Sequence, residues 1–175
     1  KVLAMPAKFQ TEKDTVKKDV MYSEYVACFA SLIHALGLLF AGIYVWFFGE
    51  ERWAGKNETI ENRALAFSIG YFLVDTYFGI VKKYNGTAMF IHHVVSILIS
   101  LNAILTNRSG YLVMLSYSLG EISNPFMLTK LITQGHPQFK EITYFSTLIF
   151  GFVFVLFRGP IAAYFGEIAF SEDIC

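Results

Sequence analysis

The sequence is a series of long apolar stretches separated by short polar connections. A hydrocarbon core about 30 Å thick is crossed by roughly 20 apolar helical residues, and about five stretches approach this length. They cover residues 23–48, 64–81, 87–105, 111–132 and 142–165. Because open backbone groups cannot be hydrated inside a bilayer, we expect each stretch to be helical. The pattern predicts an all-α fold, a polytopic membrane bundle of about five transmembrane helices.

The polar connections predict the domain organisation and the orientation in the membrane. Residues 1–22 form a charged amphipathic tail, residues 23–165 the membrane domain and residues 166–175 a short C-terminal tail. Nine Lys and Arg residues lie on the side of the N-terminal tail and four on the other side, which predicts that the tail faces the cytosol, or the matrix or stroma of an organelle. Glycosylation sequons begin at Asn57 and Asn107 on the opposite side, although chance also explains them.

The composition supports a membrane protein and excludes one class of partner. Hydrophobic residues make up 55% of the chain, and charged residues 16%, well below the roughly 25% of soluble domains. The 14 basic and 14 acidic residues cancel and leave no basic face, so nucleic acid is not an expected partner. Cys28 and Cys175 form neither a disulfide framework nor a CxxC motif. Membrane lipid, and other subunits of a membrane complex, are the expected partners.

Several ionisable residues lie inside the apolar stretches, where unpaired charges are costly. These residues are Asp75, His92, His93, Glu121 and Arg158. Mutual hydrogen bonding offsets much of that cost, so we expect them to line one interior polar cavity. Ser96 is four residues after His92 and three after His93, so either imidazole can share its helix face. The two histidines themselves diverge by about 100° around the helix axis.

Three interpretations of the histidine pair follow from the residues. One is a general base that deprotonates an amine or hydroxyl, with Asp75 or Glu121 as the orienting carboxylate. Another is a polar bridge between helices, as is common in membrane bundles. A metal site is the third, but adjacent histidines are poorly spaced as ligands on one helix, and we assign no metal. Pro125 and Pro160 are expected to bend their helices.

Four motifs, each in its own apolar segment and in order, resemble the TLC (TRAM, LAG1, CLN8) domain family. They are GYFLVD ending at Asp75, FIHHVVS with His92 and His93, EISNPF beginning at Glu121, and the late Arg158. The resemblance is strongest to the small TLC-domain proteins and implies a helical bundle around a lipid-accessible cavity. In ceramide synthases of this family a histidine pair is catalytic in N-acylation from acyl-CoA. This chain has Glu121, Ser123 and Asn124 where those enzymes carry an Asp-Asp pair, which argues against acyl transfer.

The leading hypothesis is therefore a TLC-domain protein that binds, senses or processes lipid in an intramembrane cavity. The predicted site combines His92 and His93 as candidate bases, the two orienting carboxylates, and the lipid-binding residues Ser96, Ser123, Asn124 and Arg158. The alternatives are an accessory subunit of a large membrane complex and an acyltransferase, for which acyl-CoA would be the co-substrate. We expect no other cofactor. The endoplasmic reticulum is the expected membrane, or a mitochondrial or other organelle membrane for a complex subunit.

Overall fold

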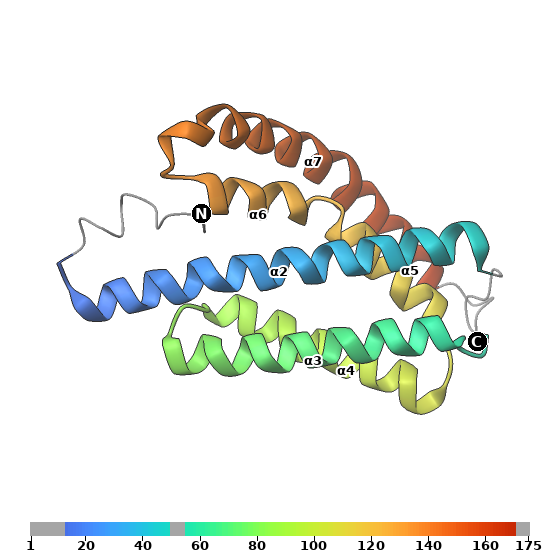
Figure 1. Ribbon diagram of the computed structural model, residues 1–175. Helices are drawn as coiled ribbons and strands as arrows, with labels where there is room; N and C mark the ends of the chain where they lie inside the picture. The colour runs from blue at the N-terminus through green and yellow to red at the C-terminus, as the bar shows by residue number, and fades with distance from the viewer. Residues whose placement is uncertain (1–12, 50–54, 171–175) are drawn as a thin grey trace.

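A computed structural model of the chain describes residues 13–49 and 55–170, with side chains described as far as residue 157 (Figure 1). The described part is helical apart from its connections. Its elements are α2 (Thr15–Phe48), α3 (Thr59–Lys82), α4 (Thr87–Thr106), α5 (Gly110–Glu121), α6 (Asn124–Thr133), the 3-10 helix η1 (Pro137–Phe139) and α7 (Lys140–Phe170). The prediction of an all-α membrane bundle is confirmed.

Four segments in the described residues are long and apolar enough to cross a membrane: Thr15–Phe48, Thr59–Lys82, Thr87–Thr106 and Pro137–Phe157. Helices α2, α3 and α4 alternate in direction, α5 and α6 continue one another, and α7 reverses again, so the connections other than the α5–α6 break lie at two ends of the bundle (Figure 1). The start of α2, the α3–α4 turn and η1 lie at one end, which we call the tail end. The α4–α5 turn and the start of α3 lie at the opposite end.

Two helices begin earlier than the hydrophobic pattern predicts, because polar residues cap their first turns. Asp14 precedes α2, and its carboxylate accepts hydrogen bonds from the backbone N–H groups of Val16 and Lys17 at 2.9 and 3.3 Å. Helix α2 therefore includes the last eight residues of the predicted tail. Helix α3 starts at Thr59, where Glu58 and Glu61 form a reciprocal capping box.

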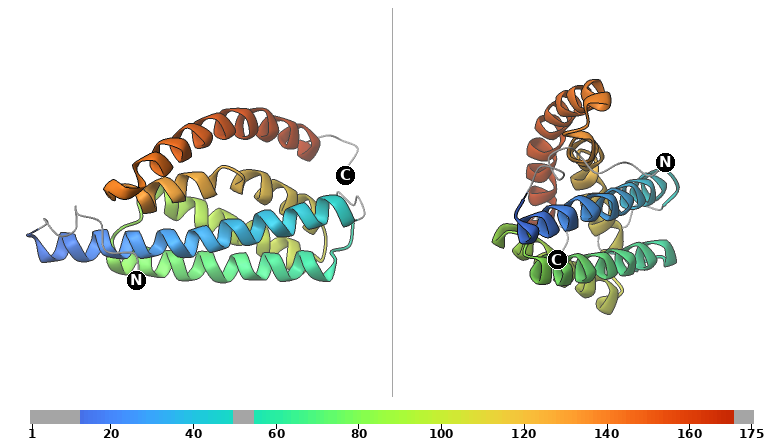
Figure 2. Two further views of the ribbon diagram at one scale, coloured as in Figure 1. Left: turned by 45° about the horizontal axis from the view of Figure 1, so that its top comes forward. Right: turned by 60° about the vertical axis from the view of Figure 1, so that its left-hand side comes forward.

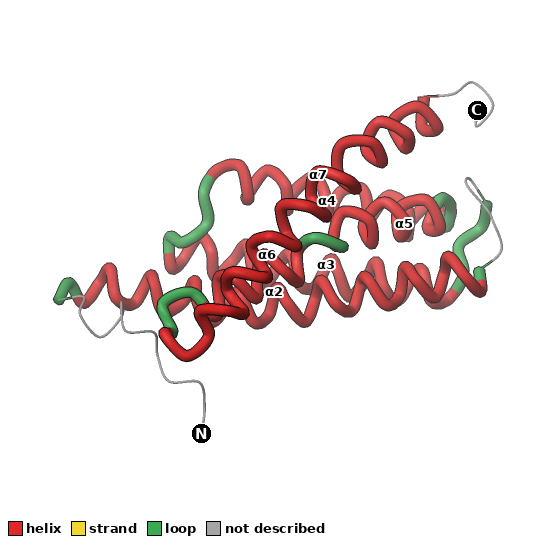
Figure 3. Tube along the Cα trace, turned by 90° about the horizontal axis from the view of Figure 1, so that it is seen from above, coloured by secondary structure: helices red, strands yellow, loops and turns green. Residues whose placement is uncertain are grey.

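The fourth predicted span is two helices rather than one, which corrects the predicted segment 111–132. Helix α5 has 12 residues and α6 has 10, so each is too short to cross a bilayer alone. Pro125 stands in the first turn of α6, where its missing N–H is harmless, and so the helix restarts there instead of bending around it. The break is the short loop between α5 and α6 in Figure 3. Pro160, in contrast, lies within α7.

Helix α2 is the centre of the bundle and packs against α3, α5 and α6. Leu38, Leu65 and Met114 form the buried contact of α2 with α3 and α5. A second cluster on α2 and α6 contains Cys28 and Leu128. Most remaining apolar side chains are exposed, as expected where lipid rather than water surrounds the helices. Helix α7 forms an outer layer over α6 and α5 (Figure 2), fastened at its start by a 2.8 Å hydrogen bond between Thr133 and Thr143.

Candidate functional site

Asp75, one of the predicted site residues, lies in the last third of α3 at the tail end, with its side chain only 10% exposed. The Tyr84 hydroxyl donates to its Oδ1 at 3.0 Å, and the Asn85 side-chain amide donates to its Oδ2 at 3.2 Å. His93 Nε2 lies 3.7 Å from Oδ2. The carboxylate thus accepts two side-chain hydrogen bonds and lies within ion-pair distance of a third side chain.

The short turn between α3 and α4 brings Tyr84 and Asn85 back onto α3. The turn begins at Lys83, whose left-handed backbone conformation (φ 57°) ends the helix and reverses the chain. Gly79 faces the Asn85 side chain so closely that a Cβ there would overlap it. Burial and the Asp75 carboxylate raise the pKa of Tyr84, so its hydroxyl keeps the proton that it donates.

The two histidines diverge, as their helical spacing predicts. His93 is 3% exposed and lies between α4 and α3, where its Nδ1 is 3.0 Å from the Thr76 hydroxyl. If Nε2 carries the ring proton, this N–H faces the Asp75 carboxylate, and Nδ1 accepts a hydrogen bond from the Thr76 hydroxyl. His92 is exposed, and its ring meets the edge of Phe72 at 5.9 Å between centroids. The structure thus brings His93, but not His92, together with Asp75.

Ser96 lies one turn further along the buried face of α4, and its carbonyl accepts a 2.7 Å hydrogen bond from the Tyr117 hydroxyl. Tyr117 also lies 2.9 Å from the hydroxyl of Ser100. These contacts fasten α5 to α4. His34 is likewise a buried contact residue, 3.2 Å from the Ser68 hydroxyl and stacked on Tyr71. The histidine of α2 therefore lies in the interface between α2 and α3.

Glu121, Ser123 and Asn124 lie at the break between α5 and α6, where the Glu121 charge still acts on Tyr71 of α3. Asn124 donates a 2.7 Å hydrogen bond to the Glu121 carboxylate across the break. Ser123 is completely buried, and its hydroxyl has no hydrogen-bond partner among the described residues. Arg158 belongs to α7, but its side chain lies outside the described residues.

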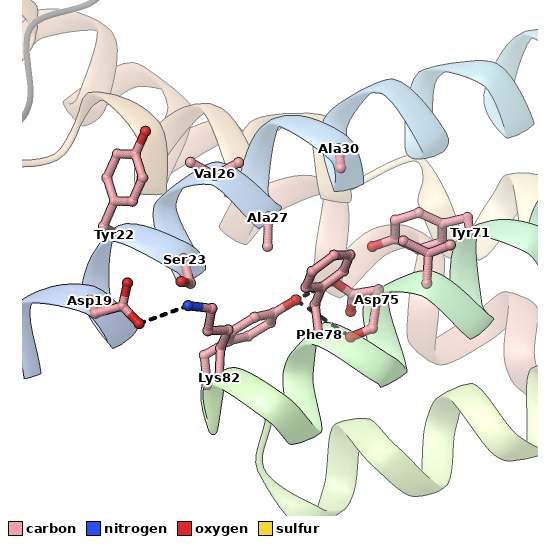
Figure 4. Close-up of a pocket in the computed structure, with 12 residues that line it drawn as sticks. Asp19, Tyr22, Ser23, Val26, Ala27, Ala30, Tyr71, Asp75, Phe78 and Lys82 are labelled. Atoms are coloured by element: carbon pink, nitrogen blue, oxygen red, sulfur yellow. Dashed lines mark hydrogen bonds and ion pairs between the residues drawn. The ribbon is translucent and has the colours of Figure 1, made fainter. Parts of the chain in front are cut away.

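A groove of about 420 Å³ runs between α2 and α3 at the tail end (Figure 4). Its walls are mainly apolar, and Lys82 bridges its mouth by an ion pair with Asp19 at 2.9 Å. The lining residues are Asp19, Tyr22, Ser23, Val26, Ala27, Ala30, Tyr71, Val74, Asp75, Phe78, Lys82 and Tyr84. Among the predicted site residues with described side chains, Asp75 alone lines it. Of the residues expected to line one interior cavity, Asp75 thus faces a groove on the side of the bundle.

Sequence reasoning missed the α2 wall of this groove. A signal was present, because Ser23, Ala27 and Ala30 recur at a spacing of four and three residues and leave room beside α3. Such small residues also occur where helices pack tightly, as at Gly42 against Ser118. The pattern alone does not distinguish a groove from a close contact.

The geometry describes a multi-pass helical membrane protein with a polar carboxylate site beside an apolar groove. Within the described residues, no three His, Cys, Asp or Glu side chains gather as a metal site would require. A family profile for the TLC domain (TRAM/LAG1/CLN8) matches residues 24–172. The chain belongs to the TLC domain family, and the resemblance found in the sequence is confirmed. No curated protein and no solved structure matches it significantly.

Proposed function

We propose that this protein binds one chain of a membrane lipid in the groove between α2 and α3. The observation that carries the proposal is the groove itself, whose volume lies within the roughly 300–1,000 Å³ typical of small-molecule sites. Its walls include Val26, Val74 and Phe78, which suit a hydrocarbon chain. Few polar groups converge on it, as in most ligand pockets.

The position of the groove supports entry from the bilayer. It is formed by neighbouring transmembrane helices and ends at Lys82, the last residue of α3. A lipid in the leaflet on this side would keep its head group near the aqueous boundary while its chain followed the helices inward. The orientation proposed from the basic residues makes this the cytosolic leaflet.

The arrangement of the histidines favours binding over acyl transfer. Both histidines lie in the described part of the chain, and neither lines the groove. The ionisable group that faces the groove from within is Asp75, which His93 and Tyr84 hold in place. A histidine base acting on acyl-CoA would need to reach a bound substrate, so the acyltransferase alternative has less support.

Photolabelling of the full chain in detergent tests the proposal. The probe is a fatty alcohol with a diazirine in its chain, and the labelled peptides are identified by mass spectrometry. We expect labels on the groove faces of α2 and α3. Replacing Ala30 with Phe fills the groove and should reduce labelling there roughly tenfold, whereas Ala66→Phe, on an exposed part of α3, should not.

Val74→Trp fills the groove from its α3 side and serves as a second groove-filling variant. Circular dichroism and thermal unfolding of each variant establish that it is folded. Labelling that is unchanged in folded Ala30→Phe and Val74→Trp variants would overturn the proposal.

A second candidate function, an accessory subunit of a membrane complex, draws support from α7. The described segment Pro137–Phe157, which holds η1 and the first part of α7, has the smallest buried share of the four long apolar segments. It exposes a row of large apolar side chains, Tyr144, Phe145, Leu148, Phe152 and Val155. Native mass spectrometry of protein extracted from its own membrane tests this role, since a large complex of fixed stoichiometry would favour it. The endoplasmic reticulum is the membrane we propose for a lipid-binding role.

A further inference from the structure

The mouth of the groove presents one positive and one negative charge side by side. Lys82 Nζ and Asp19 Oδ2 are 2.9 Å apart, on α3 and α2 respectively. Their side chains are 37% and 56% exposed, so water screens the attraction. Exposed ion pairs of this kind contribute little to stability and are therefore easily exchanged for other partners.

Deeper in the groove only a negative charge is present. Asp75 lies seven residues before Lys82 along α3, about 10 Å further from the mouth. The lining residues thus carry two carboxylates and one ammonium group, a net charge of −1. A ligand with a purely anionic head would pair with Lys82 but would leave Asp19 without its partner, with Asp75 adding to the repulsion.

The dimensions of the groove fit a single chain. The lining residues of α2 extend from Asp19 to Ala30, which is about 16 Å at 1.5 Å per residue and close to half of a 30 Å hydrocarbon core. Its volume of about 420 Å³ lies near the lower end of the roughly 300–1,000 Å³ of small-molecule sites, which favours one chain over two.

We infer that the groove selects single-chain zwitterionic amphiphiles, with an ammonium and a phosphate group in the head, over fatty acids and acyl-CoA. The ammonium group would pair with Asp19 and the phosphate with Lys82, so that a ligand replaces the ion pair between these two residues with two new ones. This inference rests on the proposed lipid binding, and adds the head group that the groove recognises.

Competition against the photoreactive fatty alcohol tests the inference in the full chain. The competitors are a lysophosphatidylcholine, a fatty acid and an acyl-CoA of equal chain length, each below its critical micelle concentration. We expect the lysophospholipid to halve labelling at a concentration roughly tenfold lower than the two anionic competitors, a difference of about 1.4 kcal/mol.

Charge variants at the mouth identify the source of this preference. Asp19→Asn should abolish the preference by improving displacement by the fatty acid, and Lys82→Gln should weaken displacement by the lysophospholipid roughly tenfold. The exchange of both residues, Asp19→Lys with Lys82→Asp, should retain the preference because both charges remain. Lys83→Gln removes a neighbouring charge that does not line the groove and is the matched control.

Equal displacement by all three competitors would overturn the head-group inference while leaving lipid binding intact. Preference for the fatty acid or acyl-CoA would overturn it as well, and would favour an anionic ligand. If no competitor displaces the probe, and groove-filling variants do not reduce labelling, the proposed lipid binding itself fails.

Discussion

The two ends of the bundle are built in different ways. At the opposite end, Asn57 is buried, and its side-chain amide donates to the Ala103 carbonyl at 2.7 Å while its Oδ1 accepts from the Gly110 backbone at 2.7 Å. The same amide donates to Asn62 at 2.9 Å. One side chain thus joins α3, α4 and α5. At the tail end, α2 and α3 are joined by an exposed ion pair above an open groove.

This difference indicates which end can accommodate a ligand. Hydrogen bonds between buried groups are costly to break, because the freed groups are left without partners. An exposed ion pair can open at little cost. The opposite end therefore acts as the fixed part of the bundle and the tail end as the adaptable part. The Asn57 side-chain nitrogen, which a glycan would modify, is engaged in two of these hydrogen bonds in the folded protein.

The largest effect is expected from removing the side chain that fixes the opposite end. Asn57→Ala leaves the Gly110 N–H without its side-chain acceptor and removes the side-chain donor of the Ala103 carbonyl, which keeps its backbone bond from Arg108. We expect a loss of about 3 kcal/mol in the free energy of unfolding. Unfolding in mixed detergent micelles, followed by circular dichroism, measures it. The control is Lys56→Ala, at an exposed neighbouring residue. A loss no larger than that of the control would mean that this end is not the fixed one.

A somewhat smaller effect is expected where α2 crosses α5. A Cβ at Gly42 would overlap the Ser118 side chain, so Gly42→Ala should destabilise the protein by about 2 kcal/mol. Ser118→Gly should restore much of that loss in the double variant. Gly70→Ala is the matched control, since a Cβ there has open space. Additive losses in the double variant would contradict the close packing of the two helices.

The helices were largely predictable because apolar length alone determines what can cross a bilayer. The early start of α2 was not predictable, since it depends on a cap by Asp14 outside the apolar stretch.

In the candidate site, the proximity of Asp75 to His93 was predicted from the sequence. The groove was not predicted, because its walls come from segments some 50 residues apart. Small residues also occur both at grooves and at tight helix contacts. The α5–α6 break, where Asn124 donates to Glu121, was not predicted either, because the apolar pattern runs through it.

At the tail end, Tyr84→Phe should have a modest effect on stability. The change removes one partly buried hydrogen bond to Asp75, for which we expect a loss of about 1 kcal/mol in the free energy of unfolding. Unfolding measured alongside Asn57→Ala compares the two ends directly. A loss equal to or greater than that of Asn57→Ala would reverse the assignment of fixed and adaptable ends.

The smallest effect on stability is expected at the mouth of the groove. Lys82→Gln removes an exposed ion pair with Asp19, and we expect a change of at most about 0.5 kcal/mol, which salt should diminish further. The same variant should weaken lysophospholipid binding roughly tenfold, because in the complex the ammonium group of Lys82 pairs with the phosphate instead of with Asp19. Lys82 would then contribute little to the free energy of unfolding and much to lipid affinity, as expected of a residue at the adaptable end. Comparable losses of stability and binding would instead show that the pair holds α2 and α3 together.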